Sequence, residues 1–221
     1  MDKRIQITEL LGTQGVLPLY YHPDTTVTAE TARALYQAGI RALEYTNRGE
    51  HALRNFERLR KLCDQELGGM FLGVGTIKEA GIAKTYVQAG ADFLVSPGLA
   101  EDVYDITYSS KTLWIPGCMT VTEILRAEQF GLRLVKLFPG SVLGPSFIES
   151  ISEIFPAISF MPTGAVGLDR TNLEAWFRAG AYAVGIGSRL LPKAALDAGD
   201  FEKIRSSAKD LLVLVEAIRK K

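Results

Sequence analysis

The sequence predicts an α/β protein, namely a (β/α)8 TIM barrel with an extra N-terminal helix, and three observations support this fold. Short β-rich runs alternate with amphipathic runs, and the β-rich runs recur roughly every 20–30 residues, as in βα units. Eight such units fit within 221 residues, and single α/β barrels commonly span about 200–250 residues. No linker or change of composition interrupts the chain, so residues 1–221 are expected to form one domain. A doubly wound open sheet is the alternative.

The predicted strands are short runs rich in β-branched, aromatic and other apolar residues. In chain order they are Val16–Tyr21, Ile40–Thr46, Met70–Gly75, Ala91–Ser96, Thr112–Pro116, Leu132–Phe138, Ile158–Thr163 and Ala181–Gly187. Amphipathic runs such as "TAETARALYQAG" and "RTNLEAWFRAG" predict the intervening helices. Several of them end in glycine, the usual residue just after a helix. Residues 1–14 predict the additional helix before the first strand.

The amino-acid composition argues against two classes of binding partner, nucleic acids and membranes. The 25 basic and 25 acidic residues give a net charge of zero, so no nucleic-acid partner is expected. No run approaches the roughly 18 apolar residues of a membrane span, and "MDKRIQITELLGTQG" lacks the apolar stretch of a signal peptide. Cys63 and Cys118 lack the spacing of metal ligands. These features favour a reduced, cytoplasmic setting without a membrane partner.

Lys136 stands alone among apolar residues in the predicted strand "RLVKLFPG". Burial disfavours the charged form of an amine, so a lysine in this position needs an explanation. Side chains alternate between the two faces of a strand, so Lys136 shares a face with Leu134. In the run "IRALEYT", Glu44 shares a face with Ala42 by the same logic. Both polar side chains are therefore expected to point into the barrel near the C-terminal ends of their strands.

Covalent catalysis would explain this pair. A desolvated lysine can be neutral near neutral pH, and its amine can attack a ketone to form a Schiff base. The nearby carboxylate of Glu44 could then transfer protons. The alternative is a buried Lys–Glu ion pair without a catalytic role, although such pairs contribute little to stability.

Further candidates lie at other predicted strand ends. The runs "MPTGAVG" and "GIGSRL" place small residues where backbone amides can approach a phosphate, as is common after strands seven and eight of such barrels. The candidate phosphate-binding residues are Gly164, Ala165, Gly187 and Ser188, with Arg189 as an additional charge. Arg48 and Thr76 could hold a substrate carboxylate. His22 and His51 fall in loops at the same end, but no third ligand fixes a metal site, so no metal is expected.

Six motifs, in order along nearly the whole chain, resemble those of class I 2-keto-3-deoxy-6-phosphogluconate (KDPG) aldolases, also described as KDPG/4-hydroxy-2-oxoglutarate aldolases. These motifs are "GIRALEYTNR", "GVGTI", "VSPGL", "IPGCMTVTE", "VKLFPG" and "MPTGAV". The resemblance implies a pyruvate-forming lyase that needs no cofactor, is cytoplasmic and forms a homotrimer. Its substrate would be a phosphorylated 2-keto sugar acid, cleaved to pyruvate and glyceraldehyde 3-phosphate.

The resemblance also implies roles for individual residues. Lys136 would form the Schiff base and Glu44 would transfer protons. Arg48 and Thr76 would bind the pyruvate carboxylate, Thr163 would contact the substrate near the new stereocentre, and Pro97 would line the site.

This sequence departs from the family pattern at the distal end of the site. Many members have Gly-Gly where this chain has Gly164–Ala165, and an apolar residue where it has Arg189. The galactonate epimer of KDPG and unphosphorylated 4-hydroxy-2-oxoglutarate therefore stay open as substrates. A phosphate-binding barrel isomerase or epimerase is a second enzyme class, and a sugar-phosphate binding protein without turnover is a third hypothesis.

Overall fold

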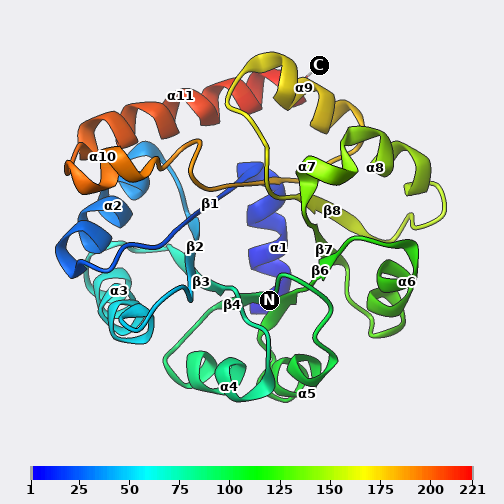
Figure 1. Ribbon diagram of the computed structural model, residues 1–221, viewed down its shortest axis with the longest axis horizontal. Coiled ribbons are helices and arrows are strands. Elements are labelled where there is room, and N and C mark those ends of the chain that lie inside the picture. The colour runs from blue at the N-terminus through cyan, green and yellow to red at the C-terminus, as the bar shows by residue number, and fades with distance from the viewer. Residues whose placement is uncertain (1, 221) are drawn as a thin grey trace.

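The alternating runs of the sequence form alternating strands and helices in the computed structural model, which describes residues 2–220. The strands are β1 (Val16–Tyr20), β2 (Ala42–Thr46), β3 (Phe71–Gly75), β4 (Phe93–Val95), β5 (Leu113–Ile115), β6 (Gly117–Cys118), β7 (Leu134–Leu137), β8 (Ser159–Pro162) and β9 (Val184–Ile186). The helices are α1 (Lys3–Gln14), α2 (Thr25–Ala38), α3 (Ala52–Glu66), α4 (Ala80–Gln88), α5 (Glu101–Ser110), α6 (Val121–Gln129), α7 (Gly140–Leu143), α8 (Pro145–Ile151), α9 (Arg170–Arg178), α10 (Lys193–Asp197) and α11 (Phe201–Arg219). The helices surround the strands (Figure 1).

The strands pair in parallel, as the βα rhythm predicts, in a six-stranded sheet of order β5-β4-β3-β2-β1-β9 and a three-stranded sheet of order β6-β7-β8. The parallel α/β fold is thus confirmed, whereas one continuous ladder of eight strands is seen only in part. Pro116, the last residue of the predicted fifth strand, separates β5 from β6, because proline has no N–H with which to continue a ladder. The short strand β6 lies beyond the predicted end and was not predicted. Isolated bridges, Phe160 with Ala181 and Thr163 with Gly185, join the regions of β8 and β9.

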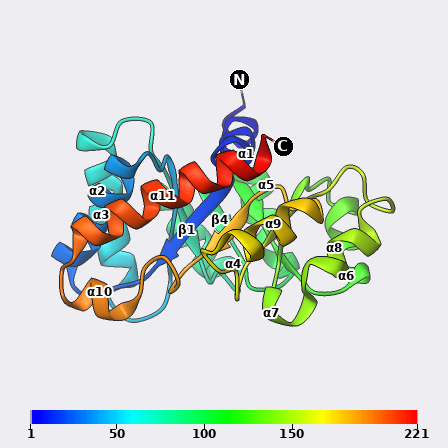
Figure 2. The same cartoon turned by 90° about the horizontal axis from the view of Figure 1, so that it is seen from above.

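Helix α1 covers the N-terminal ends of the strands. Its N-cap is Asp2, whose side chain accepts a hydrogen bond from the Arg4 amide, and its C-cap is Gly15, which has a left-handed conformation. Its fully buried Ile7 and Leu11 join the apolar residues that fill the space between the strands. The helix lies at the centre of the ring of strands in Figure 1 and at one end of the molecule in Figure 2. The predicted extra helix is therefore present and closes one end of the fold.

The alternation of side chains predicted for β2 is also observed. Ala42 belongs to the interior cluster around α1, whereas Leu43 and Tyr45 pack in the outer cluster beneath the helices. In β7, Leu134 lies in the interior cluster and Val135 in the outer one. This parity places Glu44 and Lys136 on the inner face, because each lies two residues after an inner-face residue.

A buried carboxylate, Asp92, links several elements near the N-terminal ends of the strands. Asp92 accepts hydrogen bonds of 2.7 Å from Arg60 Nη1 and from the backbone amide of Leu72, and it also forms an ion pair with Lys3 of α1. Its side chain is 6% exposed, so these partners replace the water that a carboxylate would otherwise bind. The network joins α1, α3, β3 and the start of β4.

We therefore expect Asp92→Ala to destabilise the protein by about 3–5 kcal/mol, since it leaves the Arg60 charge and the Leu72 amide without their buried partner. Urea unfolding measures this change. Asp64→Ala is the matched control, because Asp64 pairs with the same arginine from a side chain that is 63% exposed, and its loss is expected to cost at most about 1 kcal/mol. Equal effects of the two substitutions would contradict the assigned role of Asp92.

Across residues 2–220, no helix combines the length and the apolar character that crossing a membrane requires.

Candidate active site

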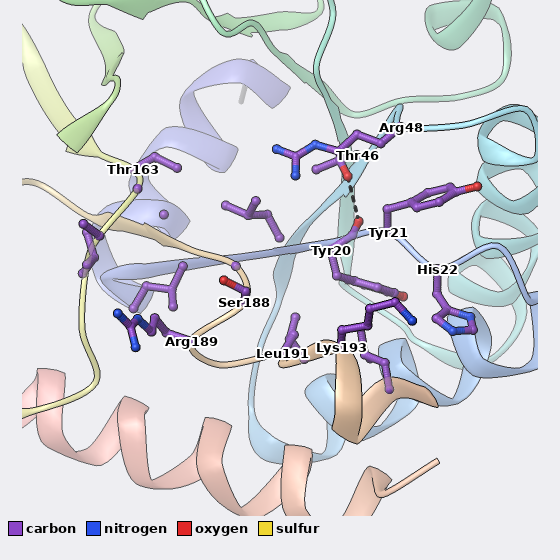
Figure 3. Close-up of a pocket in the computed structure, with 18 of the residues that line it drawn as sticks. Tyr20, Tyr21, His22, Thr46, Arg48, Thr163, Ser188, Arg189, Leu191 and Lys193 are labelled. Carbon is purple, nitrogen blue, oxygen red and sulfur yellow. Dashed lines mark hydrogen bonds between the residues drawn. The ribbon is translucent and has the colours of Figure 1, made fainter. Parts of the chain in front are cut away.

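A pocket of about 530 Å³ opens at the C-terminal ends of the strands, and residues that follow β1, β2, β7, β8 and β9 line it (Figure 3). The residues at this end come from segments far apart in the sequence, because the carboxyl ends of parallel strands meet at one edge. Most of the predicted site residues are brought together here: Arg48, Lys136, Thr163, Gly164, Ala165, Gly187, Ser188 and Arg189.

Lys136 reaches the pocket from β7, between the neighbouring strands β6 and β8. Its backbone amide donates a 2.8 Å hydrogen bond to the Pro116 carbonyl, and its Nζ lies 4.7 Å from the centroid of the Phe138 ring. The residue is 6% exposed. Burial lowers the pKa of the amine; the negative charge of Glu44 opposes this shift and the positive charge of Arg48 reinforces it. The neutral, nucleophilic form of the amine is thereby favoured.

Glu44 lies on the inner face of β2 and is 2% exposed. A Cβ atom at Gly75 on the neighbouring β3 would lie only 1.7 Å from Glu44 Oε1, so glycine at this position makes room for the carboxylate. Burial raises the pKa of Glu44, while the charges of Lys136 and Arg48 act in the opposite direction. A raised pKa brings the carboxyl closer to the range in which it can both accept and donate protons.

Glu44 and Lys136 affect each other's pKa without direct contact. In the described part of the chain, no carboxylate oxygen lies within the 4.0 Å ion-pair distance of Lys136 Nζ. The buried salt bridge that was the alternative explanation for the two residues is therefore not what the structure contains. A reaction in which both groups act on one bound molecule requires that they are not paired with each other.

Arg48 contributes a cation that has no ion-pair partner among residues 2–220. It follows β2, it is exposed, and its guanidinium forms no ion pair or hydrogen bond with any side chain of residues 2–220. Figure 3 shows this side chain across the pocket from Thr163. An arginine without a partner at the mouth of a pocket is suited to bind a carboxylate by paired hydrogen bonds.

Three predicted site residues, Glu44, Thr76 and Pro97, are not among the residues that line this pocket. Thr76 directly follows β3 and has a φ of 66°, a left-handed conformation that is unfavourable for a β-branched residue. Such strain is found preferentially at functional sites. Pro97 follows β4, and its carbonyl group packs so closely on Gly117 that a Cβ atom there would lie 2.3 Å away. Gly117 is in turn the strand partner of Lys136.

Thr163 presents an unsatisfied hydroxyl group. The residue follows β8 and is 5% exposed, and its Oγ1 has no hydrogen-bond partner among the described residues. A Cβ atom at Gly185 would lie 2.2 Å from this oxygen, so the glycine of β9 makes room for it. A buried polar atom without a partner usually awaits a ligand or a water molecule.

The loops after β8 and β9, which were predicted to bind phosphate, both line the pocket. Gly164 and Ala165 both have positive φ angles, 92° and 60°, and the latter is costly for a residue with a side chain. Within residues 2–220, the amides of Ala165 and Ser188 donate no hydrogen bond to a protein acceptor. Unpaired amides beside a cavity can bind the oxygens of an anion.

One wall of the pocket consists of residues that were not predicted as site residues, although the sequence already placed His22 in a loop at this end. Tyr21, His22 and Pro23 after β1 form part of it, and the segment from Leu191 to Asp197 forms the rest. Their position directly after β1 and after the loop of β9 is the signal that could have identified them, since the same strand-end argument was applied to the other strands.

The two histidines differ in their surroundings. His22 lines the pocket, whereas His51 precedes α3 and lies 3.4 Å from Glu50. Among residues 2–220, no three His, Cys, Asp or Glu side chains converge in a way that could hold a metal ion.

Comparison with known proteins places this arrangement among aldolases. The family model "KDPG and KHG aldolase" matches residues 7–207. A 2-dehydro-3-deoxy-phosphogluconate aldolase of Pseudomonas aeruginosa is 31% identical over 96% of this chain and 94% of its own length. A KHG/KDPG aldolase of Escherichia coli is 30% identical over 91% and 92%, respectively. A KDPG aldolase of Legionella pneumophila, solved with pyruvate captured as a covalent carbinolamine, superposes with a TM-score of 0.85 at 26% identity over 92% of this chain and 97% of that one.

Proposed function

Because the chain belongs to the KDPG and KHG aldolase family and is accordingly a lyase, we propose that it cleaves 2-keto-3-deoxy-6-phosphogluconate to pyruvate and glyceraldehyde 3-phosphate through a Schiff base on Lys136. Cleavage of 4-hydroxy-2-oxoglutarate to pyruvate and glyoxylate is a second activity to be tested. The observation that carries the proposal is the buried lysine with a lowered pKa, placed near a buried carboxylate but not paired with it. The carbinolamine captured in the Legionella pneumophila protein is consistent with this chemistry.

The reaction begins when the neutral amine of Lys136 attacks the C2 ketone of the substrate. Loss of water from the resulting carbinolamine gives an iminium ion, which serves as the electron sink. Glu44 takes the proton of the C4 hydroxyl, directly or through a water molecule, and the C3–C4 bond breaks with its electrons moving into the iminium. The aldehyde leaves, and the remaining enamine is protonated at C3 and hydrolysed to pyruvate, which regenerates the free amine.

The other residues bind and orient the substrate in this proposal. Arg48, with its unpaired guanidinium, and Thr76 hold the carboxylate of the pyruvate half. Thr163 directs its unsatisfied hydroxyl to the substrate near C4, and Pro97 supports the strand that neighbours Lys136. The amides of the Gly164–Ala165 and Gly187–Ser188 loops receive the phosphate. No cofactor is required, because the lysine itself supplies the electron sink.

A phosphate site predicts strong discrimination between substrates. Losing one charge-assisted hydrogen bond costs about 1.5–3 kcal/mol, and several are lost together, so the phosphorylated acid should exceed its dephospho analogue in kcat/KM by at least about 10²-fold. Arg189→Ala should reduce this preference without changing exchange of the pyruvate methyl protons. Steady-state cleavage kinetics measure the first effect, and NMR in deuterated water measures the second.

Arg205→Ala serves as the matched control, since Arg205 pairs with Glu202 on the surface of α11 and should leave the preference intact. Equal kcat/KM for the two substrates would show that the barrel uses no phosphate site. An unphosphorylated keto acid would then be the substrate, and Ala165 would be the first residue to examine.

Two alternatives are separated by the same assays. The galactonate epimer differs from KDPG at the carbon near Thr163, so side-by-side kinetics with both epimers identify the preferred one. An isomerase or epimerase that uses Glu44 as base and Lys136 only as a charge would not become covalently labelled when pyruvate and borohydride are added.

The proposal includes the organisation expected of the family. The strands of both sheets would form one (β/α)8 barrel within a single domain, residues 1–221, and the protein would be a cytoplasmic homotrimer. Light scattering of the purified protein measures the oligomeric state.

A further inference from the structure

Hydrogen bonds from three different elements hold the backbone of His22 in place. Its backbone carbonyl accepts hydrogen bonds from Thr28 Oγ1 at 3.0 Å, from Tyr45 Oη at 2.9 Å and from Asn55 Nδ2 at 3.2 Å. Asn55 is fully buried, and its amide also donates to the Pro23 carbonyl at 2.9 Å. Elements β2, α2 and α3 thus fix the loop after β1, and with it the position of the imidazole.

The ring nitrogens of His22 are also assigned by their partners. Nδ1 accepts a 3.1 Å hydrogen bond from the Asp24 amide, so the proton of the neutral ring lies on Nε2. Nε2 is 3.2 Å from Asp197 Oδ1 on α10, and it can donate to that carboxylate. The histidine side chain is only 12% exposed. The loop after β1 thereby holds the Nε2–H group of His22 in position to donate to Asp197, which lies 175 residues later in the chain.

Asp197 is the last residue of a segment that lines the pocket on the side of the proposed phosphate site. This segment begins with Ser188 and Arg189 and continues through the buried Leu191 and Leu196. Lys193 also pairs with Asp197, but it belongs to the same helix and cannot tie the segment to another element. Figure 3 shows His22 and Lys193 next to each other at one end of the pocket. The His22–Asp197 hydrogen bond is the polar contact that connects this segment to the loop after β1.

We propose that His22 is a positioning residue that determines affinity for the distal, phosphorylated end of the substrate. Its hydrogen bond to Asp197 fixes the segment from Ser188 to Asp197 against β1, and so sets where Ser188 and Arg189 meet the phosphate. The pyruvate half, bound at Lys136 and Arg48, is independent of this contact. This inference rests on the proposed aldolase function.

Kinetics of three variants test the proposal. His22→Leu should raise KM for the phosphorylated substrate about tenfold, a conservative value for a hydrogen bond to a charged group, while kcat changes by less than about twofold. His22→Gln, whose Nε2 can replace the donor to Asp197, should recover KM to within about threefold of the wild type. Exchange of the pyruvate methyl protons should be the same in all variants. His51→Leu is the control, because that histidine does not line the pocket.

Asp197→Ala tests the contact from its other side. It should raise KM in the same way, and the double variant with His22→Leu should be no worse than the more impaired single variant, since both remove one contact. An unchanged KM in His22→Leu, no recovery in His22→Gln, or additive effects in the double variant would overturn the role of His22. Wild-type protein that fails to exchange pyruvate protons would instead reject the aldolase function, and this inference with it.

Discussion

Replacing Lys136 with methionine is expected to abolish turnover while the fold stays intact. Methionine has nearly the same length and fits the apolar surroundings of β7, but it has no amine to attack the substrate ketone. Because every step of the proposed reaction proceeds through the Schiff base, loss of activity should reach the detection limit rather than a partial reduction. Cleavage assays with KDPG measure this effect directly.

Trapping with borohydride identifies the lysine that reacts. Mass spectrometry of wild-type protein treated with pyruvate and borohydride should show an adduct of roughly 72 Da on Lys136, the mass of a reduced pyruvate imine. Lys84→Met on the exposed face of α4 is the matched control and should react like the wild type. An adduct on another lysine, or turnover by Lys136→Met, would contradict the assignment.

The same substitution is expected to maintain or raise stability, and the sign follows from the lowered pKa of Lys136. The unfolded chain binds the lysine proton more tightly than the native protein does, so charging this lysine destabilises the native state at all pH values below the ordinary lysine pKa of 10.5. Methionine removes this cost. Urea unfolding near pH 7 should therefore show Lys136→Met to be at least as stable as the wild type. The advantage should fade as the pH rises above the lowered pKa of folded Lys136 and be absent above the ordinary lysine pKa of 10.5.

Glu44→Gln is expected to slow proton transfer by about 10²–10⁴-fold while some imine still forms. Glutamine fits the space above Gly75 and keeps a hydrogen-bonding group there, but it cannot accept the C4 hydroxyl proton or exchange protons with the enamine. The exchange of pyruvate methyl protons with deuterated water measures this step without the cleavage reaction. Borohydride trapping should still label Lys136 in this variant.

Glu50→Gln provides the comparison, since Glu50 lies in the loop after β2 with a side chain that is 85% exposed. Its exchange rate should equal that of the wild type. Wild-type exchange in Glu44→Gln would remove Glu44 from the mechanism. Complete loss of imine trapping would instead assign it to the first step, the formation of the Schiff base.

Much of this architecture can be predicted from local patterns in the sequence. The period-two alternation in "IRALEYT" and "RLVKLFPG" places Glu44 and Lys136 on the inner face, because side-chain direction along a strand depends only on position in the strand. The recurrence of βα units predicts that the strand ends meet, and this is why Arg48, Thr163 and Ser188 are found around one pocket. Both inferences need only local conformation and the parallel arrangement of strands.

Other features depend on contacts that no local pattern encodes. Whether Glu44 and Lys136 form an ion pair is decided by the spacing between β2 and β7, and the structure keeps them apart. The sequence prediction ended the fifth strand at Pro116 and missed β6, whose two residues are too few to show a strand pattern and pair only because β7 lies beside them.

The sequence by itself determined the type of fold, the family and the identity of the buried amine and carboxylate. Only the tertiary structure decided that Thr163 keeps an unsatisfied hydroxyl, and that His22 meets Asp197 in one wall of the pocket. The physical reason is that these properties belong to pairs of atoms brought together by chain segments far apart. Their distances are set by the packing of whole helices and strands, whereas the direction of a side chain is set by its own few residues of backbone.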